Sequence, residues 1–423
     1  MLVDAWLPRA ARRHPDRLAI NALTYAQLLA EVDATARRLA GRGVRVGDRV
    51  AIALAPGDAF CVALHAVLRI GAVAVPVDLR LSARERARVT EGTNEVIDGA
   101  VIGTPAAEAR LRERHDLDAP AIVVHTSGTS GQPKAVELTY GNWLWSALGS
   151  AVALGLHPQE RWLCALPLTH VGGLSIVLRS AIYGTTAVVH ERFETERVLD
   201  ALMAPGGPTI VSLVPTTLQR LLDAGLRDPP ALRWALLGGA PATTGLQGRA
   251  AAAGVRVAPT YGLTEACSQV TTLGAPLFCT RVRLAPDREI LVGGPTVTGW
   301  VGSNRPTLAT GDLGDWSSDG ALRVVGRKAD TIISGGENVA PAEVESVLEA
   351  HPDVYEAAVH GRADPQWGEA VVATVVADED VEADELRAWC AARLASYKVP
   401  KEIAFATALP RTGSGKLVRR ELR

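Results

Sequence analysis

Between residues 125 and 137 the chain reads HTSGTSGQPKAVE, a run of glycine and hydroxyl-bearing residues that contains one lysine. Successive backbone N–H groups in such a loop can form a concave anion site, because glycine permits close approach and unusual dihedral angles. The hydroxyl groups add donors, and the lysine adds a full positive charge. We therefore expect phosphate binding, with a solvated turn as the alternative, at Thr126, Ser127, Gly128, Thr129, Ser130, Gly131 and Lys134.

This loop differs from the GxxxxGK[ST] phosphate loop of many nucleoside triphosphatases. Pro133 stands where that motif has a glycine, and Ala135 stands where it has serine or threonine. A nucleoside triphosphatase of that class is therefore disfavoured. A hydrolase is disfavoured too, because the chain has no GxSxG segment.

The elements around the loop alternate between short β-branched runs and amphipathic segments. Residues 49–54 and 72–77 are typical of strands, and residues 58–71 between them are typical of a helix that ends at a glycine. The same cycle recurs in residues 207–215, 216–225 and 232–239. This alternation predicts an α/β fold in which a large N-terminal domain contains mostly parallel sheets covered by helices.

The C-terminal part of the chain has a different pattern. Strand-like residues 354–361 and 369–377 are followed by a predicted helix at 382–395 and by a basic tail. This mixture predicts a small α+β domain. We expect the boundary between the two domains to lie between Gly326 and Asp330.

The amino-acid composition limits which partners the protein can bind and where in the cell it is expected. The chain has 44 basic and 46 acidic side chains among 423 residues and no long basic run, which argues against nucleic acid as a main partner. Its five cysteines form no CxxC pair, which fits a reducing cytoplasm and argues against structural zinc. The N-terminal segment lacks the apolar core of a signal peptide, and the apolar region 59–77 contains His65 and Arg69. We therefore expect a cytoplasmic protein without membrane insertion.

Further segments follow the loop in a recognisable order. They are GGAP (238–241), YGLTEA (261–266), TGD (310–312), GR (326–327), SGGENVAPAEVE (334–345) and PRTGSGKLVRREL (410–422). Together with the loop they resemble the motifs of the adenylate-forming superfamily, which includes acyl- and aryl-CoA synthetases, adenylation domains of peptide synthetases and luciferases. The resemblance covers almost the whole chain and implies two domains, a large one at 1–327 and a small mobile lid at 328–423.

The resemblance implies a first reaction in which a carboxylic acid is joined to AMP from ATP and pyrophosphate is released. Two anions must meet, and at about 4 Å like unit charges cost roughly 4 kcal/mol even at an effective dielectric constant near 20. Cations and N–H donors must offset this repulsion. The superfamily uses Mg²⁺ as one of these cations.

Roles for five polar residues follow from the resemblance. Glu265 is expected to bind Mg²⁺, since a hard cation prefers carboxylate oxygen, and Thr264 to bind an α-phosphate oxygen. Asp312 offers two acceptor oxygens to the ribose hydroxyls, assisted by Arg327. Lys416 is expected to bridge the acid and the α-phosphate, because its long flexible stem can reach into a cleft. The remaining nucleotide-binding positions implied are Gly239, Ala240, Pro241, Tyr261 and Gly262.

Taken alone, these residues also allow simpler interpretations. Glu265 could be a helix N-terminal glutamate stabilised by the helix dipole. The TGD segment could be a turn, Tyr261 could be a packing residue, and Lys416 could belong to a solvated basic tail. The order of the motifs favours the functional interpretation of each.

In the second reaction of the superfamily a thiol, here coenzyme A, displaces AMP after the small domain rotates. The alignment on GR puts the pivot at Ala329, where many relatives have Asp or Lys. Gly335 and Gly336 are expected to line the tunnel for the pantetheine arm, because only glycine leaves room there.

The segment 166–193 most resembles the o-succinylbenzoate–CoA ligases, the menaquinone-pathway branch of the superfamily. His170 is expected at the wall between acid and nucleotide, with Gly172 and Gly173 leaving space for an aromatic ring. Arg179 could bind a second carboxylate of the acid or could face solvent. Gly238 and Ser268 are also expected to border the acid. Thr169 stands where relatives often have Phe, and residues 272–293 are fewer than in relatives, so pocket closure is left open.

The leading hypothesis is therefore an ATP-dependent aryl-acid–CoA ligase whose partners are a small carboxylic acid and coenzyme A. The alternatives are a ligase for another aryl or fatty acid, a stand-alone domain that loads a carrier protein, and a nucleotide-binding protein without ligase activity. The sequence leaves the oligomeric state open, a homo-oligomer included.

Overall fold

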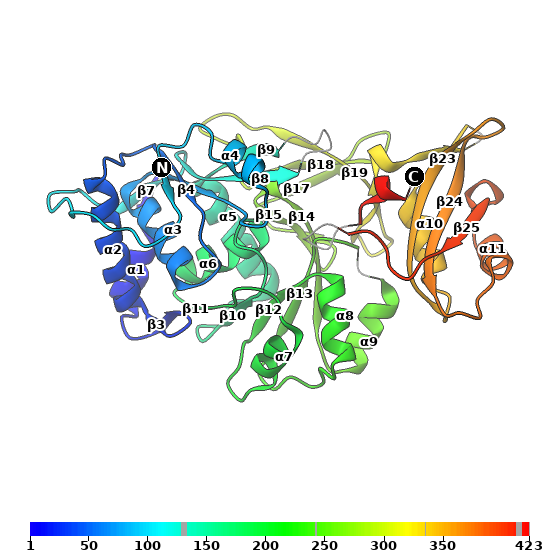
Figure 1. Ribbon diagram of the computed structural model, residues 1–423, viewed down its shortest axis with the longest axis horizontal. Coiled ribbons are helices and arrows are strands. Elements are labelled where there is room, and N and C mark those ends of the chain that lie inside the picture. Colours follow the sequence, from blue (N-terminus) through cyan, green and yellow to red (C-terminus); the bar gives the residue numbers. More distant parts are fainter. Residues whose placement is uncertain (128–132, 242, 335, 412–416, 423) are drawn as a thin grey trace.

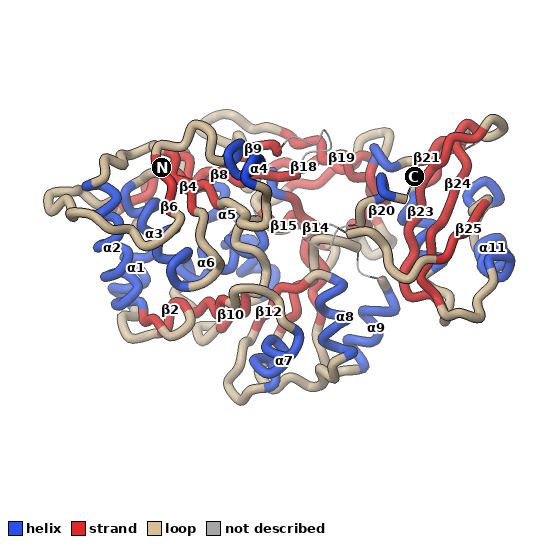
Figure 2. The backbone as a smooth tube through the Cα atoms, viewed as in Figure 1, coloured by secondary structure: helices blue, strands red, loops and turns tan. Residues whose placement is uncertain are grey.

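The computed structural model describes residues 1–127, 133–241, 243–334, 336–411 and 417–422. A large body holds the N-terminus and most helices, and a smaller body at the right of Figure 1 holds the C-terminal elements. The tube view separates the sheets of the large body from the sheet of the smaller one (Figure 2).

A nine-stranded sheet runs through the large body. From β2 through β11, β10, β12 and β13 to β14 all neighbouring strands are parallel, and β3, β15 and β16 extend the two ends by antiparallel pairing. The strands are β2 (Leu18–Ile20), β3 (Leu23–Thr24), β10 (Arg161–Cys164), β11 (Thr186–Val189), β12 (Ile210–Leu213), β13 (Trp234–Leu237), β14 (Val257–Leu263), β15 (Ser268–Thr272) and β16 (Ala275–Pro276).

A five-stranded sheet in the order β6-β4-β5-β8-β9 stands beside it. Its strands are β6 (Glu95–Ile97), β4 (Arg49–Ile52), β5 (Val73–Pro76), β8 (Pro120–Ser127) and β9 (Pro133–Thr139). All pairs are parallel except β8 with β9, which form an antiparallel hairpin. This hairpin flanks the expected phosphate loop. A separate two-stranded pair joins β1 (Leu2–Asp4) to β7 (Arg114–Asp116).

Helices cover the parallel strands, as the alternation predicts. They are α1 (Trp6–Arg13), α2 (Tyr25–Gly41), α3 (Asp58–Ile70), α4 (Ala83–Val89), α5 (Tyr140–Leu154), α6 (Val171–Tyr183), α7 (Thr195–Met203), α8 (Pro215–Asp223) and α9 (Thr244–Ala252). In α3 every residue from Phe60 to Ile70 is buried, and Gly71 ends the helix with φ of 85°. In the part of the chain that the structure describes, no helix is long and apolar enough to cross a membrane.

A third sheet of the large body is fully antiparallel, unlike the mostly parallel sheets that the sequence predicts for this domain. It consists of β17 (Arg281–Leu284), β18 (Glu289–Gly293), β19 (Thr307–Trp316) and β20 (Leu322–Arg327) in this order. Short connections join β17 to β18 and β19 to β20, and such connections allow only antiparallel pairing. The short segment 272–293 thus forms β16, β17 and β18.

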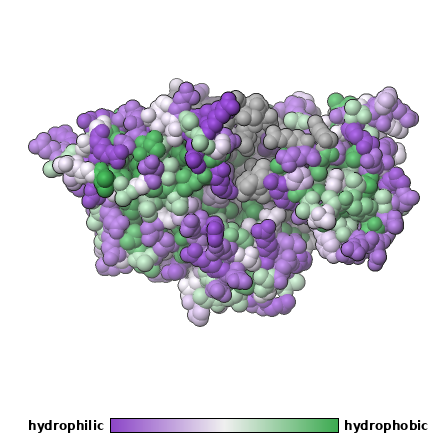
Figure 3. Space-filling model, in the orientation of Figure 1, coloured by the Kyte–Doolittle hydropathy of each residue, from purple (hydrophilic) through white to green (hydrophobic). Residues whose placement is uncertain are grey.

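The smaller body has its own sheet and hydrophobic core. The sheet contains β21 (Ile332–Ser334), β22 (Glu337–Val339), β23 (Val354–Asp364), β24 (Gly368–Ala377) and β25 (Glu402–Phe405). Helices α10 (Pro341–Leu348) and α11 (Ala383–Ala391) pack on it, with a core that includes Val344, Val371 and Leu386. The chain enters this body through the short helix η2 (Lys328–Asp330), and η4 (Arg419–Glu421) lies near the end of the chain. On the face drawn in Figure 3, hydrophobic residues lie among hydrophilic ones on both bodies.

Candidate active site

Three of the sequence motifs follow parallel strands of the nine-stranded sheet. Residues 166–170 follow β10, residues 238–241 follow β13, and residues 264–266 follow β14 as the short helix η1 (Thr264–Ala266). Because these strands are parallel, their carboxyl ends meet at one edge of the sheet. Ligands of open α/β sheets bind at this edge.

The phosphate-loop hairpin reaches the same edge from the five-stranded sheet. The Nζ atom of Lys134 lies 3.7 Å from Oε1 of Glu265. Thr126 pairs with Lys134 across the hairpin, and its hydroxyl donates to the Lys134 carbonyl oxygen at 3.4 Å. The structure thus brings together three residues that the sequence analysis assigned to the triphosphate and its metal. A half-buried carboxylate beside Lys134, a residue expected to bind phosphate, fits the preference of Mg²⁺ for carboxylate and phosphate oxygens.

Glu265 is held in place by Thr298, a residue that the sequence analysis did not identify. The backbone N–H of Thr298 donates to the Glu265 carbonyl oxygen at 2.7 Å. The Thr298 hydroxyl donates to the Glu137 carbonyl oxygen on β9, also at 2.7 Å. One residue therefore links the two sheets that carry the candidate metal ligand and the phosphate loop. The sequence gives no signal for this link, because Thr298 lies outside the motifs.

At two positions of the site, Gly262 and Gly239, the backbone favours glycine over any other residue. A Cβ atom at Gly262 would lie 1.7 Å from the carbonyl oxygen of Ser268, so β14 and β15 approach too closely there for any side chain. Gly239 has φ of 82° in the turn after β13, a conformation that favours glycine. Ser268 itself has φ of 91° at the start of β15. In the same turn Gly238 and Ala240 are half-buried, and Pro241 is exposed.

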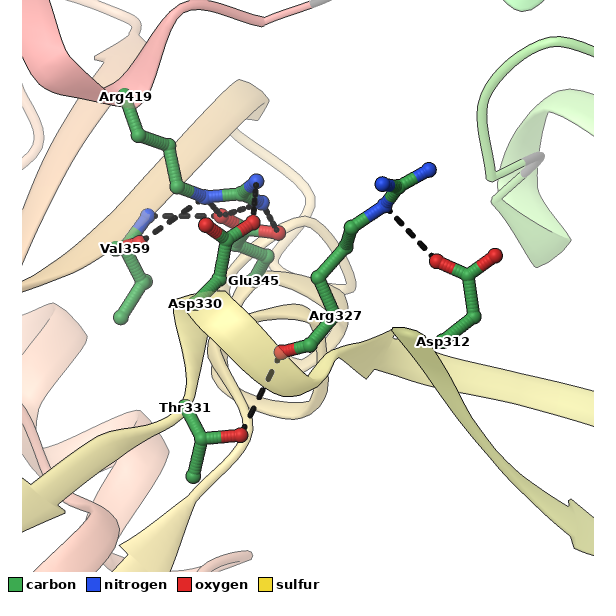
Figure 4. A network of polar contacts seen from close by, with 7 residues as sticks. All are labelled: Asp312, Arg327, Asp330, Thr331, Glu345, Val359 and Arg419. Carbon is green, nitrogen blue, oxygen red and sulfur yellow. Dashed lines mark hydrogen bonds and ion pairs between the residues drawn. The ribbon is translucent and has the colours of Figure 1, made fainter. Parts of the chain in front are cut away.

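A second cluster joins Tyr261, Asp312 and Arg327, as expected for a ribose site. The Tyr261 hydroxyl donates to Oδ2 of Asp312 at 2.7 Å. Nε of Arg327 lies 2.8 Å from Oδ1 of Asp312, and Figure 4 shows this ion pair. Asp312 and Arg327 face each other across β19 and β20. The Asp312 carboxylate is buried, with 7% of the side chain exposed, so charged and polar partners compensate for its lost hydration.

The hydroxyl of Tyr261 makes a contact that the sequence analysis did not predict. This hydroxyl is a hydrogen-bond donor to the Asp312 carboxylate, which is expected to bind the ribose. Burial, and then the nearby Asp312 charge, raise the pKa of Tyr261 above its usual range. The phenol therefore stays protonated and can donate this hydrogen bond at every physiological pH.

On the acid side, His170 lies at the N-terminus of α6 and is half-buried. The expectation that Gly172 and Gly173 open space for an aromatic ring is wrong for Gly173. A Cβ atom at Gly173 would lie 2.4 Å from the Pro167 carbonyl oxygen, so this glycine allows α6 to pack against its preceding turn. At Gly172 the nearest atom to such a Cβ is the side chain of Leu166, at 3.3 Å.

Arg179 is buried, with 2% of the residue exposed, which rules out the solvent-facing alternative. Its Nη2 donates to the Ser146 hydroxyl at 3.1 Å, and the Ser146 hydroxyl donates to the carbonyl oxygen of Cys267, two residues after Glu265. The guanidinium also lies 5.5 Å from the centre of the Trp162 ring. Within the described part of the chain, no carboxylate lies within 4.0 Å of Arg179, and its Nε lacks a hydrogen-bond partner. Burial lowers the pKa of Arg179.

Some predicted positions lie outside the described residues. They are Gly128, Thr129, Ser130, Gly131, Gly335 and Lys416, together with the side chain of Ser127. At Gly336, φ is 85°, and a Cβ atom there would meet nothing within 4 Å. In this arrangement of the chain, glycine is favoured at 336 by its positive φ. Neighbouring atoms would leave space for a side chain there.

Comparison with known proteins matches most of the chain to two family models. Residues 7–97 and 93–299 match the model for the AMP-binding enzymes, and residues 343–416 match the model for the C-terminal domain of AMP-binding enzymes. The chain is 38% identical to the 2-succinylbenzoate–CoA ligase of Bacillus licheniformis, and the alignment covers 100% of both proteins.

Solved structures with the same fold include the o-succinylbenzoate CoA synthetase of Bacillus subtilis. Its complex with the acyl-adenylate intermediate has a TM-score of 0.90 at 36% identity, covering 100% of this chain and 98% of that one. Its complex with ATP and a magnesium ion also has a TM-score of 0.90 at 36% identity, covering 100% of both chains. Both similarities extend over the large and the small body.

Proposed function

We propose that this chain, which belongs to the family of AMP-binding enzymes, is an ATP-dependent ligase that joins 2-succinylbenzoate to coenzyme A. The observation that carries the proposal is the similarity over the full length of both proteins to a ligase of that name. The two polar clusters, Lys134 with Glu265 and Tyr261 with Asp312 and Arg327, supply the chemistry that such a ligase needs.

In the first step the acid carboxylate attacks the α-phosphorus of ATP, and pyrophosphate leaves. Lys134 and the backbone N–H groups of its loop would hold the phosphates, and Thr264 would donate to an α-phosphate oxygen. Glu265 would hold Mg²⁺, which supplies positive charge to the phosphate oxygens. Lys416 would approach from the C-terminal segment and reduce the repulsion between the two anions.

The ribose cluster would orient the nucleotide. The Asp312 carboxylate would accept hydrogen bonds from the ribose hydroxyls, while Arg327 and Tyr261 hold it against β19 and β20. Because this carboxylate is buried and fixed by two partners, little conformational entropy is lost when the ribose binds. The turn at Gly239, Ala240 and Pro241, with Gly262, would border the adenine.

We assign the second step to a rotation of the small domain, with residues 1–327 as the large domain and 328–423 as the small one. The pivot would be Ala329 in η2. Gly335 and Gly336 would then approach the pantetheine arm of coenzyme A. The thiol displaces AMP from the acyl-adenylate and forms the thioester.

The acid would lie between α6 and the η1 turn. His170 at the start of α6 would separate it from the nucleotide, and Gly238 and Ser268 would border it. Arg179 lies behind the η1 turn, linked through Ser146 to Cys267. A buried guanidinium without a carboxylate partner among the described residues is suited to a second carboxylate of the acid, because an unpaired buried charge is costly. We place the enzyme in the cytoplasm and in menaquinone biosynthesis.

The proposal is tested by pyrophosphate release from ATP across 2-succinylbenzoate, benzoate and octanoate, followed by the mass of the product formed with coenzyme A. We expect the highest kcat/KM with 2-succinylbenzoate and the mass of its CoA thioester. A higher kcat/KM with another acid would show that this other acid is the preferred substrate, and the proposed reaction class would remain supported. Bound ATP without pyrophosphate release from any acid would instead favour a nucleotide-binding protein that is not a ligase.

A further inference from the structure

A bulge in β19 places Asp312 in the site. The pairing of β18 with β19 shifts between Glu289 and Leu291, so that residues 310–312 of β19 lie opposite a single residue of β18. The backbone groups within the bulge therefore lack their normal ladder partners. Such groups need other hydrogen bonds to hold the strand in a single conformation.

Side chains supply these hydrogen bonds. The Thr310 hydroxyl donates to the Ile290 carbonyl oxygen at 2.8 Å and accepts from the Asp312 N–H at 3.1 Å. The N–H of Gly311, whose φ is 72°, donates to Oε1 of Glu289 at 2.9 Å. The N–H groups of Gly311 and Asp312 are thus both held by side chains.

The second carboxylate oxygen of Glu289 contacts Lys328, the first residue of η2. Oε2 lies 3.0 Å from Nζ of Lys328, which also contacts Oδ2 of Asp287 at 2.6 Å. Only 14% of the Glu289 side chain is exposed. The hydrogen bond from Lys328, followed by that from Gly311, holds the pKa of Glu289 below its usual range, so the carboxylate stays charged.

The contacts close a ring. Lys328 directly follows Arg327, and Nε of Arg327 lies 2.8 Å from Oδ1 of Asp312. Asp312 directly follows Gly311, whose N–H donates to Glu289. The Glu289 carboxylate therefore links the bulge that carries Asp312 to the first residue of η2, where the small body begins.

We propose that Glu289 is a positioning residue for the ribose-binding carboxylate Asp312, and that Lys328 holds Glu289 in this role. The inference rests on the proposed function, since it takes Asp312 to bind the ribose of ATP. Without Glu289 the Gly311 N–H loses its acceptor, and the bulge can relax so that the Asp312 oxygens leave the positions that match the two ribose hydroxyls. Neither Glu289 nor Lys328 needs to touch the nucleotide for this effect.

The test measures equilibrium binding of ATP and of 2′,3′-dideoxy-ATP, each with Mg²⁺, to the full chain. The variants are Glu289→Ala, Glu289→Gln, Lys328→Ala and Lys328→Arg. The matched control is Asp315→Asn on β19, which removes an exposed ion pair with Arg288, the residue before β18, without touching the bulge or η2. Thermal unfolding of each variant checks that it is folded.

We expect Glu289→Ala to raise the Kd for ATP about tenfold, and Lys328→Ala to raise it about threefold, from the usual strength of hydrogen bonds to charged groups. Glu289→Gln keeps an acceptor for Gly311 and should lie between wild type and Glu289→Ala. Lys328→Arg should restore binding to within about twofold of wild type. For dideoxy-ATP, which lacks both hydroxyls, all variants should bind as wild type does.

An equal loss of affinity for both nucleotides would overturn the inference, because it would indicate a general structural defect. Unchanged ATP binding by Glu289→Ala and Lys328→Ala would overturn it as well. If Glu289→Ala does not fold, Glu289→Gln and Lys328→Ala decide the matter. Failure of the proposed function gives a different result: the wild-type chain itself would then bind ATP and dideoxy-ATP equally, or neither of them.

Discussion

Lys134 lies on a strand of one sheet and Glu265 lies just after a strand of another, yet Nζ of Lys134 lies 3.7 Å from Oε1 of Glu265. Lys134 is the second residue of β9 in the five-stranded sheet, and Glu265 follows β14 of the nine-stranded sheet. This pair marks the place where the phosphate loop meets the candidate metal ligand. With 67% of the Lys134 side chain and 21% of the Glu265 side chain exposed, both groups remain accessible to a nucleotide.

Replacing Glu265 by Gln should impair adenylation strongly while leaving the fold intact. The amide retains the shape of the side chain but loses the charge that attracts Mg²⁺, an effect of several kcal/mol in the transition state. We expect acid-dependent pyrophosphate release to fall about 100-fold, with a higher Mg²⁺ concentration needed for half-maximal rate. An unchanged dependence of the rate on Mg²⁺ concentration would show that Glu265 does not bind the metal. Glu137→Gln, whose side chain is exposed on β9, serves as the control.

Replacing Asp312 by Asn should weaken ATP binding. The variant loses the charge that Arg327 and Tyr261 hold in place, and hydrogen bonds to charged groups are worth about 1.5–3 kcal/mol. We expect KM for ATP to rise by about 10- to 100-fold. Tyr261→Phe removes only one of the hydrogen bonds to Asp312 and should raise KM by less than about tenfold. A larger effect of Tyr261→Phe than of Asp312→Asn would contradict this assignment of roles.

Replacing Arg179 by Met tests recognition of the second carboxylate. Methionine fills much of the buried volume, so the loss of charge is separated from the loss of packing. We expect KM for 2-succinylbenzoate to rise about tenfold or more, while KM for benzoate, which has a single carboxylate, stays within about twofold. Equal increases for the two acids would indicate that Arg179 only supports the fold around Ser146 and Trp162.

Two buried histidines should make the large body sensitive to acid. The pKa of His65 is lowered to about 4 and the pKa of His115 to about 3, mainly because both rings are buried. The His115 ring stacks on Tyr140 with 4.2 Å between centroids. Below pH 6.5 the unfolded chain binds protons that the folded chain does not bind. Stability is therefore present above this pH and is lost as the pH falls, by about 1.4 kcal/mol per pH unit for each histidine.

His115→Phe keeps an aromatic ring in this stack and removes the titration. The free energy of unfolding of this variant should depend less on pH between 6.5 and 5, by about 1.4 kcal/mol per pH unit. Urea unfolding at a series of pH values measures this slope. His157→Gln, at an exposed histidine, is the control variant. The same slope in His115→Phe and wild type would show that His115 is protonated in the folded protein.

Much of the fold and of the chemistry could be predicted from local sequence. The alternation of β-branched and amphipathic runs predicted the strands β4, β5, β12 and β13 and the helices α3 and α8, because the period of apolar residues reflects which face of an element is buried. The order of the motifs predicted an AMP-binding enzyme and implied a large and a small domain. The motifs that contain Lys134, Glu265 and Asp312 predicted a phosphate, a metal and a ribose site through their resemblance to the superfamily.

The partners of these residues could not be predicted in the same way. Tyr261 and Asp312 are 51 residues apart, and their hydrogen bond exists because β14 and β19 from different sheets meet. The sequence alone allowed Arg179 to face solvent, but packing of α5 and α6 buries it beside Ser146. The space expected at Gly173 is taken up by the close approach of the preceding turn.

The amino-acid sequence by itself therefore determined which chemical groups this protein has and in which order they occur along the chain. Only the tertiary structure decided which of them touch, as in the ring of Glu289, Lys328, Arg327 and Asp312. The physical reason is that residue type and periodicity are local properties. Contact between side chains depends instead on how separate sheets pack, on bulges in strand pairing, and on which charges lose their water.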